Sequence, residues 1–434
     1  MVGGGLSGLF AASELVAAGI DDLVLLERNP EPGGVARTVG RDGFMLEPAA
    51  GSVSLPHPHL SPILDRIGAE MVATEPGAAA RYVFADDRLV RVPASPRALL
   101  APVVPWNSKL RALAEPMIGR EPYGLEESLQ MFCERRLGRT TGAILAWLMA
   151  SGVYAGDPEL LSARSAFPML VGLEDRHGSV IRGAISRRRD RSSDVTPRSH
   201  VPLGGMGALA ERAASYLGSR FRGGFSVESV RRHGNEWVVE GEESMRADAV
   251  VVAARPEDAA RVLDGDLADH LIRLTSAPVA VIGLGGTDGS MPSGFGALIG
   301  PGPLATLGIL FESSYAPDRA PDGSWLIKVI AGGATRPEVV DWEDGRLISQ
   351  IREEASLILG REIDPSFTEV VRHQPGIPQP VIGHAEWLST VDRMLADRPG
   401  LHLTGWGYRG VGVTHLATDA VRVAKAVGGS VERE

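Results

Sequence analysis

The residues most able to do chemistry stand at the start of the chain, in a glycine-rich loop that reads Gly3-Gly4-Gly5-Leu6-Ser7-Gly8. In a dinucleotide-binding loop the first glycine allows a tight turn, the second lets backbone approach a pyrophosphate, and the third lets the following helix pack on a sheet. The helix N-terminus adds free N–H groups for the phosphates. We therefore predict a phosphate site at this loop.

The segment after the loop completes a βαβ unit, with a helix to residue 18 and a strand over 23–27 that ends in Glu27 and is followed by Arg28. Glu27 follows the last loop glycine by about 20 residues, the distance expected of an acid that binds a ribose hydroxyl. A surface acid after a buried strand is the alternative. Because all the parts occur in one unit, we favour the nucleotide site.

A second glycine turn, Gly33-Gly34-Val35-Ala36-Arg37-Thr38, follows soon after the acid. It resembles the opening pattern of the flavin amine oxidase superfamily, in which the chain doubles back beside FAD. An NAD dehydrogenase does not need this turn. Near the C-terminus, a strand from Leu401, a glycine-rich turn and a helix over 414–427 would offer the flavin another helix N-terminus. The alternative is an ordinary turn at residues 33–34.

The first strand is expected to be short, because only Met1 and Val2 precede Gly3, whereas strands average about five residues. This leaves open a start further upstream or weakened flavin binding. Further strands are expected over 225–230 and 249–254, the latter a continuous apolar run typical of a buried parallel strand.

Composition limits the class of protein and of partner. The net charge of −10 over 434 residues argues against nucleic acid as a partner. The single Cys133 excludes an intrachain disulfide and a multi-cysteine metal site, so we predict no metal and a reducing, cytoplasmic location. The longest apolar run, 143–154, is shorter than the ~20 residues of a membrane span and predicts a buried helix.

Peripheral contact with the inner face of the cell membrane stays open. The apolar segment from Leu99 to Trp106 precedes Lys109 and Arg111, a pattern that fits a membrane surface. A loop folded onto the core is equally compatible. The sequence also leaves a monomer and a homodimer open.

Several separated blocks go beyond a superfamily likeness. They are Gly152-Val153-Tyr154-Ala155-Gly156-Asp157-Pro158, residues 161–168, residues 294–299, residues 307–313, Ile377-Pro378-Gln379 with Gly383-His384, and Tyr408-Arg409-Gly410-Val411-Gly412-Val413. Together they resemble the oxygen-dependent protoporphyrinogen oxidase family over nearly the whole chain.

The resemblance implies an α/β fold with a Rossmann-like FAD-binding domain, a substrate domain and a helical domain that contacts the membrane in relatives. We expect residues 1–55, 204–256 and 385–434 to bind FAD, residues 56–90 and 257–384 to bind substrate, and residues 91–203 to be helical. The implied FAD contacts are Gly3, Gly4, Gly5, Leu6, Ser7, Gly8, Glu27, Arg28, Gly34, Val35, Ala49, Ala50, Gly51, Ser52, Val227, Trp406, Val411, Gly412 and Val413.

For the substrate, the resemblance implies that Arg81 binds a propionate and that Phe295 and Leu298 sandwich a tetrapyrrole. The loop at Gly152 would let backbone approach the ring, and a guanidinium suits a carboxylate. The implied reaction removes six electrons and six protons from protoporphyrinogen IX in three hydride transfers to FAD, which O2 reoxidises with formation of H2O2. No residue is assigned as catalytic base, and His384 is expected to be structural.

Three alternatives remain open. One is coproporphyrinogen III as substrate, with four carboxylates instead of two. Another is an amine or secondary-metabolite oxidase, suggested by departures from the family pattern at Ala49-Ala50, Pro380 and Thr414-His415. The last is a porphyrin-binding protein poor in flavin, suggested by the short first strand.

Overall fold

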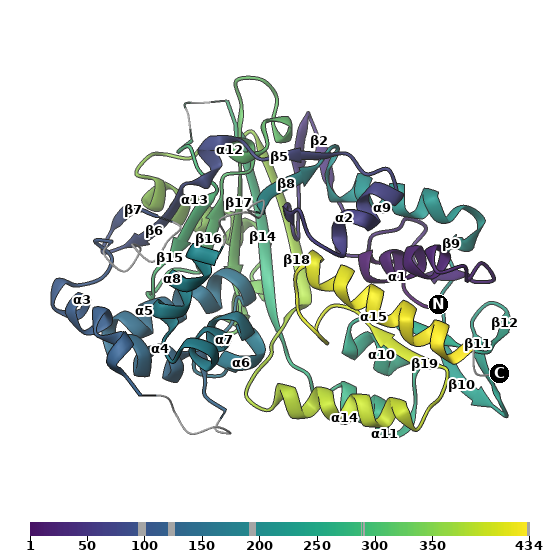
Figure 1. Cartoon of the computed structure of the whole chain (residues 1–434). Coiled ribbons are helices and arrows are strands. Elements are labelled where there is room, and N and C mark those ends of the chain that lie inside the picture. Colours follow the sequence, from purple (N-terminus) through teal and green to yellow (C-terminus); the bar gives the residue numbers. More distant parts are fainter. Residues whose placement is uncertain (94–100, 120–125, 191–196, 288, 290, 432–434) are drawn as a thin grey trace.

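The computed structural model describes residues 1–93, 101–119, 126–190, 197–287, 289 and 291–431. Figure 1 shows the glycine-loop helix α1 (Leu6–Ala17) and the C-terminal helix α15 (Val413–Val431) side by side on the right. The long strands run through the middle, and a group of helices lies at the lower left. Both termini lie on the right side of this view.

The nucleotide-type side is built on parallel strands from distant parts of the chain. They are β1 (Leu25–Glu27), β9 (Phe221–Gly223), β13 (Val250–Ala253) and β19 (Leu401–Thr404). Val2 pairs in parallel with Leu26 on one side and with Val252 on the other, and so joins β1 to β13. A single paired residue thus carries Gly3 to the centre of the sheet, where its N–H donates to the Leu26 carbonyl at 2.8 Å.

Helices α1, α15, α9 (Gly205–Leu217) and α2 (Leu60–Arg66) share one apolar core beside this sheet. Three antiparallel elements surround it. They are the hairpin β2 (Val39–Arg41) with β3 (Phe44–Leu46), the sheet of β4 (Val53–Leu55), β8 (Arg198–Pro202) and β5 (Met71–Ala73), and the meander β10 (Ser229–His233), β11 (Glu236–Glu240) and β12 (Ser244–Ala247). The short helices η4 (Gly218–Arg220), α10 (Pro256–Val262) and α11 (Gly265–Leu271), with α14 (His384–Ala396), complete this side.

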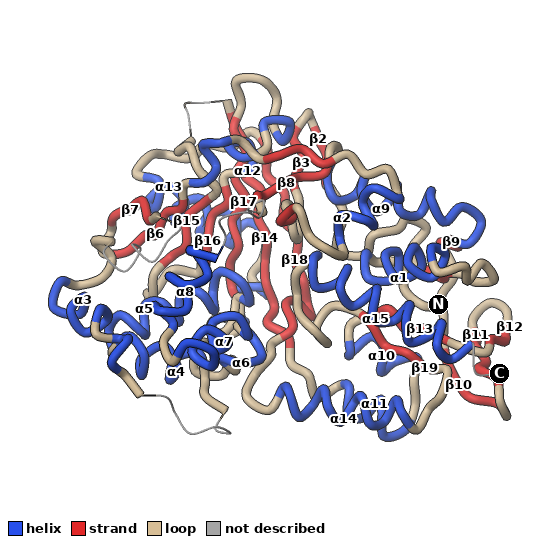
Figure 2. The backbone as a smooth tube through the Cα atoms, in the orientation of Figure 1, coloured by secondary structure: helices blue, strands red, loops and turns tan. Residues whose placement is uncertain are grey.

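A seven-stranded sheet forms the other half and appears as the long red strands of Figure 2. Its order is β18 (Phe367–Pro378), β14 (Ser276–Gly286), β17 (Trp325–Gly332), β16 (Thr306–Leu310), β15 (Gly296–Ile299), β6 (Arg81–Ala85) and β7 (Arg88–Val92). Helix α13 (Asp344–Leu359) covers one face through a shared core of large apolar residues. The short elements η1 (Pro76–Ala79), α12 (Glu312–Tyr315), η5 (Pro317–Arg319) and η6 (Pro337–Asp341) connect its strands.

The helical region comprises α3 (Trp106–Leu113), η3 (Glu115–Met117), α4 (Leu129–Leu137), α5 (Arg139–Tyr154), α6 (Ala163–Ala166), α7 (Pro168–His177) and α8 (Val180–Asp190). Its centre is an ion pair between the fully buried Arg136 and Glu115. Glu115 also accepts hydrogen bonds from the N–H groups of Val180 and Ile181 at the start of α8. In the described ranges, no helix is long and apolar enough to cross a membrane.

Some sequence expectations need correction. The strand expected over 225–230 begins only at Ser229. Phe225 instead donates its N–H to the Glu27 carbonyl at the end of β1. Helix α2 shares an apolar core with α1, and strand β5 pairs with β8. Strand β8 in turn ends the span expected to be helical. Leu99 and Leu100 of the apolar segment lie outside the described residues.

Candidate functional site

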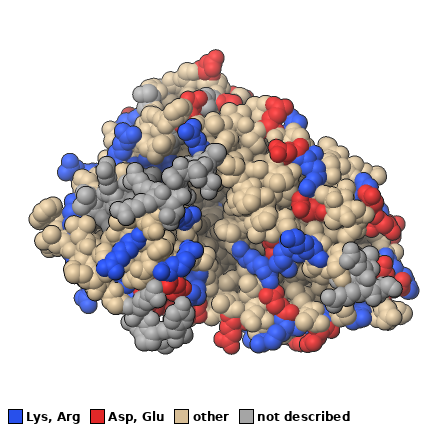
Figure 3. Space-filling view, in the orientation of Figure 1, with Lys and Arg blue, Asp and Glu red and all other residues tan. Residues whose placement is uncertain are grey.

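A cavity of about 680 Å³ opens at the glycine loop and extends between the two halves of the molecule. Fourteen of the nineteen expected FAD contacts line it: Gly3, Gly5, Leu6, Ser7, Glu27, Arg28, Gly34, Val35, Ala49, Ala50, Val227, Trp406, Val411 and Val413. The other five, Gly4, Gly8, Gly51, Ser52 and Gly412, do not line it. In the space-filling view this face of the molecule is hollowed near its centre, with Lys and Arg on both flanks (Figure 3).

The loop glycines divide into two kinds. Gly3 has a φ of +103°, and a Cβ on Gly8 would lie 1.9 Å from the Gly3 carbonyl oxygen, so both are required for the turn and for close packing of α1. Gly5 has an ordinary φ of −69°, and a Cβ there would meet no atom nearer than the Gly33 oxygen at 3.8 Å. Gly5 therefore keeps space open toward the cavity.

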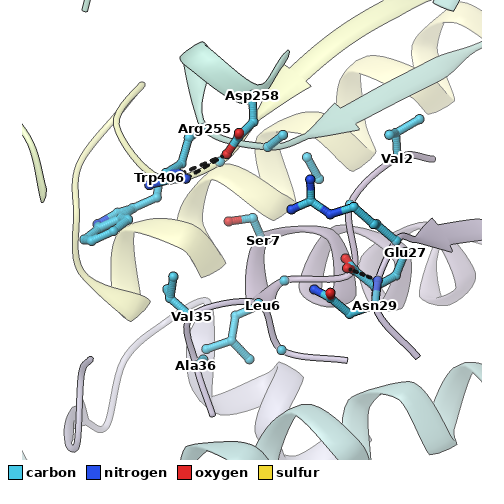
Figure 4. Close-up of a pocket in the computed structure, with 18 of the residues that line it drawn as sticks. Val2, Leu6, Ser7, Glu27, Asn29, Val35, Ala36, Arg255, Asp258 and Trp406 are labelled. Carbon is cyan, nitrogen blue, oxygen red and sulfur yellow. Dashed lines mark hydrogen bonds and ion pairs between the residues drawn. The ribbon is translucent and has the colours of Figure 1, made fainter. Parts of the chain in front are cut away.

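Glu27 ends β1 at the edge of the cavity, and only 8% of it is exposed. One carboxylate oxygen accepts from the Gly4 N–H at 2.6 Å, and the other accepts from the Asn29 N–H at 2.8 Å. Figure 4 shows the Glu27 carboxylate beside Asn29, with Ser7 at the start of the helix nearby. The acid is thus held rigidly beside the phosphate loop, as a ribose site requires.

The opposite wall of the cavity is formed by residues that no sequence motif indicated. Arg255 follows β13 and binds Asp258 at 2.9 Å and the Pro375 carbonyl at 2.6 Å, and both Arg255 and Asp258 line the cavity (Figure 4). His373, on β18, also lines it and contacts the Pro48 carbonyl through Nε2 at 3.0 Å. Burial lowers the pKa of His373, so the neutral ring donates from Nε2. The only sequence signal was the buried strand that delivers Arg255.

Several buried charged side chains lie behind residues 47–50, at the wall of this cavity. Lys328, on β17, donates to the Glu47 and Ala49 carbonyls at 2.9 and 3.1 Å and pairs with Glu312 at 2.7 Å. The Glu47 carboxyl accepts from the Met206 N–H at the start of α9 and lies 3.7 Å from Arg319. Burial raises the pKa of Glu47 to about 7, an effect that the nearby Arg319 opposes.

The structure brings the expected substrate residues together in two pairs. The Arg81 guanidinium lies 4.1 Å from the centre of the Phe295 ring, which stacks on Tyr315 at 4.8 Å. Gly152 lies in helix α5 and not in the expected loop, and Leu298 packs against it, so that an added Cβ would lie 2.9 Å from the leucine side chain. None of these four residues lines the 680 Å³ cavity.

Strand register places these pairs on one face of the large sheet. Gly296 pairs with Arg81 and Leu298 pairs with Val83, and directly paired residues project from the same face. Residues 81 and 83 also share a face, because side chains alternate along a strand. Arg81 and Leu298 therefore both project toward α5, which approaches that face through Gly152.

His384 lies in a second cavity of about 330 Å³, together with Arg164 and Arg409. Its Nε2 contacts the Tyr408 carbonyl at 3.2 Å, and burial lowers its pKa. This contact ties α14 to the C-terminal turn and is a structural one. Val411 lines both cavities, so they adjoin at that turn.

The residues of the larger cavity fit FAD on structural grounds. An open space remains at Gly5 where a Cβ would stand, the first turn of α1 faces the same space, and the Glu27 carboxylate lies beside it. The first N–H groups of a helix have no partner within the helix, and they bind phosphate well. These features define a dinucleotide site at the carboxyl ends of parallel strands.

The chain belongs to the family described as flavin-containing amine oxidoreductases, which matches residues 6–427. It is a FAD-dependent oxidoreductase. Among its relatives, the chloroplastic protoporphyrinogen oxidase of Oryza sativa subsp. japonica is 30% identical, with 98% of this chain and 87% of that protein covered. The coproporphyrinogen III oxidase of Bacillus subtilis is 26% identical, with 95% and 94% covered. A crystal structure from Exiguobacterium sp. 255-15 has a TM-score of 0.84 at 22% identity over 99% of this chain and 98% of that one.

Proposed function

We propose that this protein oxidises protoporphyrinogen IX to protoporphyrin IX in heme biosynthesis, with O2 as the final electron acceptor. The full-length likeness to the Oryza sativa protein supports this substrate. Bound FAD would supply the hydride acceptor, and the protein would hold the macrocycle beside it. Three rounds of two-electron oxidation balance the loss of six electrons and six protons.

The observation that carries the proposal is a patch of half-buried apolar side chains on one face of the large sheet. On the central strands β15, β16 and β17, the only positions that are not buried are Leu298, Leu310 and Ile330. Through the pairs of Leu298 with Gly308 and of Gly308 with Ile330, and of Gly296 with Leu310, they share the face of Arg81. We call these three residues with Arg81 the sheet floor.

The sheet floor suits a tetrapyrrole. Apart from Arg81 it is apolar, and the glycines at positions 296 and 308 between its residues add no side chains. Arg81 stands at its β6 edge and can pair with a propionate, whereas Lys328 stands in the same row on β17 against the wall of the larger cavity. Three strand spacings separate β6 from β17, or about 14 Å. A macrocycle on this floor would therefore reach from Arg81 toward the flavin.

The test is anaerobic mixing of the flavin-loaded protein with protoporphyrinogen IX. Bleaching of the flavin, followed by porphyrin fluorescence and H2O2 when air is admitted, would support the proposal. Arg81→Met should raise KM about tenfold or more, because a charge-assisted pair contributes about 1.5–3 kcal/mol. Arg88→Met is the matched control, because Arg88 is an exposed arginine on the adjacent strand β7. A bound flavin that the substrate does not bleach would contradict the proposal.

Coproporphyrinogen III is the second candidate substrate. One structural observation favours it: Arg164 and Arg409, which pair with Asp175 and Asp392, line the cavity that adjoins the flavin side and add positive charge there. The Bacillus subtilis relative carries the name of this reaction. Parallel titrations with both porphyrinogens rank them, and a lower KM for coproporphyrinogen III would reverse our order.

Peripheral contact with the inner face of the cell membrane is a further part of the proposal. Trp106, Leu110, Leu113 and Met117 are 74%, 65%, 53% and 79% exposed. The first three follow one face of α3 at a spacing of four and three residues, Met117 ends the next short helix η3, and Lys109 stands beside Trp106. Such an apolar stripe beside a basic residue suits a lipid surface.

Flotation with vesicles tests this contact. The wild type should float with vesicles that contain anionic lipid, and the double variant Trp106→Ser, Leu110→Ser should not. Leu357→Ser is the matched control, since Leu357 is 52% exposed on α13. Equal flotation of all three proteins would refute the contact.

A further inference from the structure

Three consecutive backbone carbonyls at the wall of the larger cavity are each held by a side chain of the large sheet. Lys328 on β17 donates to the Glu47 and Ala49 oxygens, and His373 on β18 donates to the Pro48 oxygen between them. The distances are 2.9, 3.1 and 3.0 Å. We call residues 47–49 the carbonyl strip.

The donors behind the strip are themselves fixed. Lys328 is 2% exposed, and its third interaction is the ion pair with the fully buried Glu312. The register pairs Lys328 with Gly283 and His373 with Val279, two positions on one face of β14, so both side chains project from the same face of the sheet. Two rigid strands thus hold a loop that joins β3 to β4.

This arrangement also fixes the direction of the backbone N–H groups that follow the held carbonyls. In a trans peptide, the C=O of one residue and the N–H of the next point in opposite directions. Because the Pro48 and Ala49 carbonyls face the sheet, the N–H groups of Ala49 and Ala50 point away from it. Among the described residues neither N–H has a hydrogen-bond acceptor, and both residues line the larger cavity.

We propose that Lys328 and His373 are positioning residues, which fix the carbonyl strip so that the Ala49 and Ala50 N–H groups face the ring system of bound FAD. This inference rests on the assignment of the larger cavity to FAD, but it does not depend on the substrate. Oriented N–H groups bind an electron-rich acceptor more strongly, so they favour reduced flavin over oxidised flavin.

The experiment uses the full chain without substrate. Lys328→Met removes the charge and its donors while keeping the length of the side chain, and His373→Leu removes the ring donor. Lys328→Arg and His373→Gln retain an N–H donor and serve as the conservative variants. Arg136→Met is the control for stability, since it breaks an equally buried ion pair in the helical region, away from the cavity.

Three quantities are measured: the Kd for FAD, the visible spectrum of the bound flavin, and its midpoint potential. Lys328→Met and His373→Leu should each weaken FAD binding about tenfold or more. A tenfold loss of preference for reduced over oxidised flavin lowers the potential by about 30 mV. The conservative variants should have a Kd for FAD and a midpoint potential closer to those of the wild type. Arg136→Met should lower Tm without changing the Kd, the spectrum or the potential of the bound flavin.

The outcomes separate the possibilities. Wild-type Kd, spectrum and potential in both Lys328→Met and His373→Leu would overturn the inference, even if Tm fell. If Lys328→Met does not fold, the pair His373→Leu and His373→Gln decides. Failure of the wild type to bind FAD would remove this inference together with the cavity assignment. Normal FAD behaviour without bleaching by porphyrinogens would overturn only the proposed substrate.

Discussion

Replacement of Gly5 by alanine separates the demands of the cofactor from those of the fold. The backbone of Gly5 has a φ of −69°, which alanine adopts without strain, and its Cβ would meet nothing nearer than 3.8 Å. Loss of the favoured N-cap glycine costs up to about 1 kcal/mol, and lower entropy of the unfolded chain offsets about 0.4–1 kcal/mol of that. The stability of the cofactor-free protein should therefore change by less than about 1 kcal/mol.

Binding of FAD should suffer far more, because the added methyl group would stand where the pyrophosphate approaches the start of α1. Loss of one or two charge-assisted hydrogen bonds from the helix N–H groups costs about 3 kcal/mol or more. This corresponds to a Kd raised about a hundredfold or more. Titration of the cofactor-free protein with FAD, followed by flavin fluorescence quenching, measures the change, and thermal unfolding measures the stability.

Gly19→Ala is the matched control on the same segment. Gly19 follows the C-terminal end of α1 with a φ of +85° and open space around it, so alanine there costs about 1–2 kcal/mol of stability by backbone strain alone. FAD affinity should stay at the wild-type value. A Gly5→Ala protein that binds FAD as the wild type does would refute our assignment of the pyrophosphate to this loop.

Three further predictions concern the buried groups. Gly8→Ala should prevent soluble expression or lower Tm severely, because its Cβ would overlap the Gly3 carbonyl oxygen, and circular dichroism with melting checks this. A pKa of about 7 for Glu47 means that the native state retains this proton above the ordinary pKa of 4.5, so wild-type stability should fall by about 3 kcal/mol between pH 4.5 and 7 relative to Glu47→Gln; parallel urea titrations across this range would contradict us if the difference were constant. Arg136→Met should lower the unfolding free energy by about 3–5 kcal/mol in denaturant titrations, since it leaves Glu115 buried without its cation.

The phosphate side of the site could be predicted from the sequence because its parts are local. Gly3, Gly5, Gly8 and Glu27 stand within one short unit, and their spacing follows from the turn, the helix and the strand that join them. The same unit indicated a dinucleotide-binding fold, and the family match confirms the flavin amine oxidase type that the resemblance implied. The short first strand did not prevent this arrangement, since Val2 pairs with neighbours on both sides.

The other side of the site could not be predicted, because its residues acquire their roles only through strand order. Arg255, Lys328 and His373 lie on or after three strands that are distant in sequence, and no spacing connects them. In the sequence, Lys328 is a single cation within an apolar strand. The loop crossing of residues 47–49 over β17 and β18 gives its ammonium group two carbonyl acceptors, and Glu312 is the third partner.

The phosphate loop and the sheet floor differ in how many substitutions they tolerate. The phosphate loop constrains backbone conformation, so few substitutions are compatible with it. The sheet floor is set by side chains at single positions, Leu298, Leu310 and Ile330, each on a strand whose neighbours are buried. A substitution at one of them reshapes the floor while the core behind it, formed with α13, stays intact. On the proposed assignment of the substrate to this floor, selectivity among porphyrinogens would change through these positions and Arg81 while the FAD site stays constant.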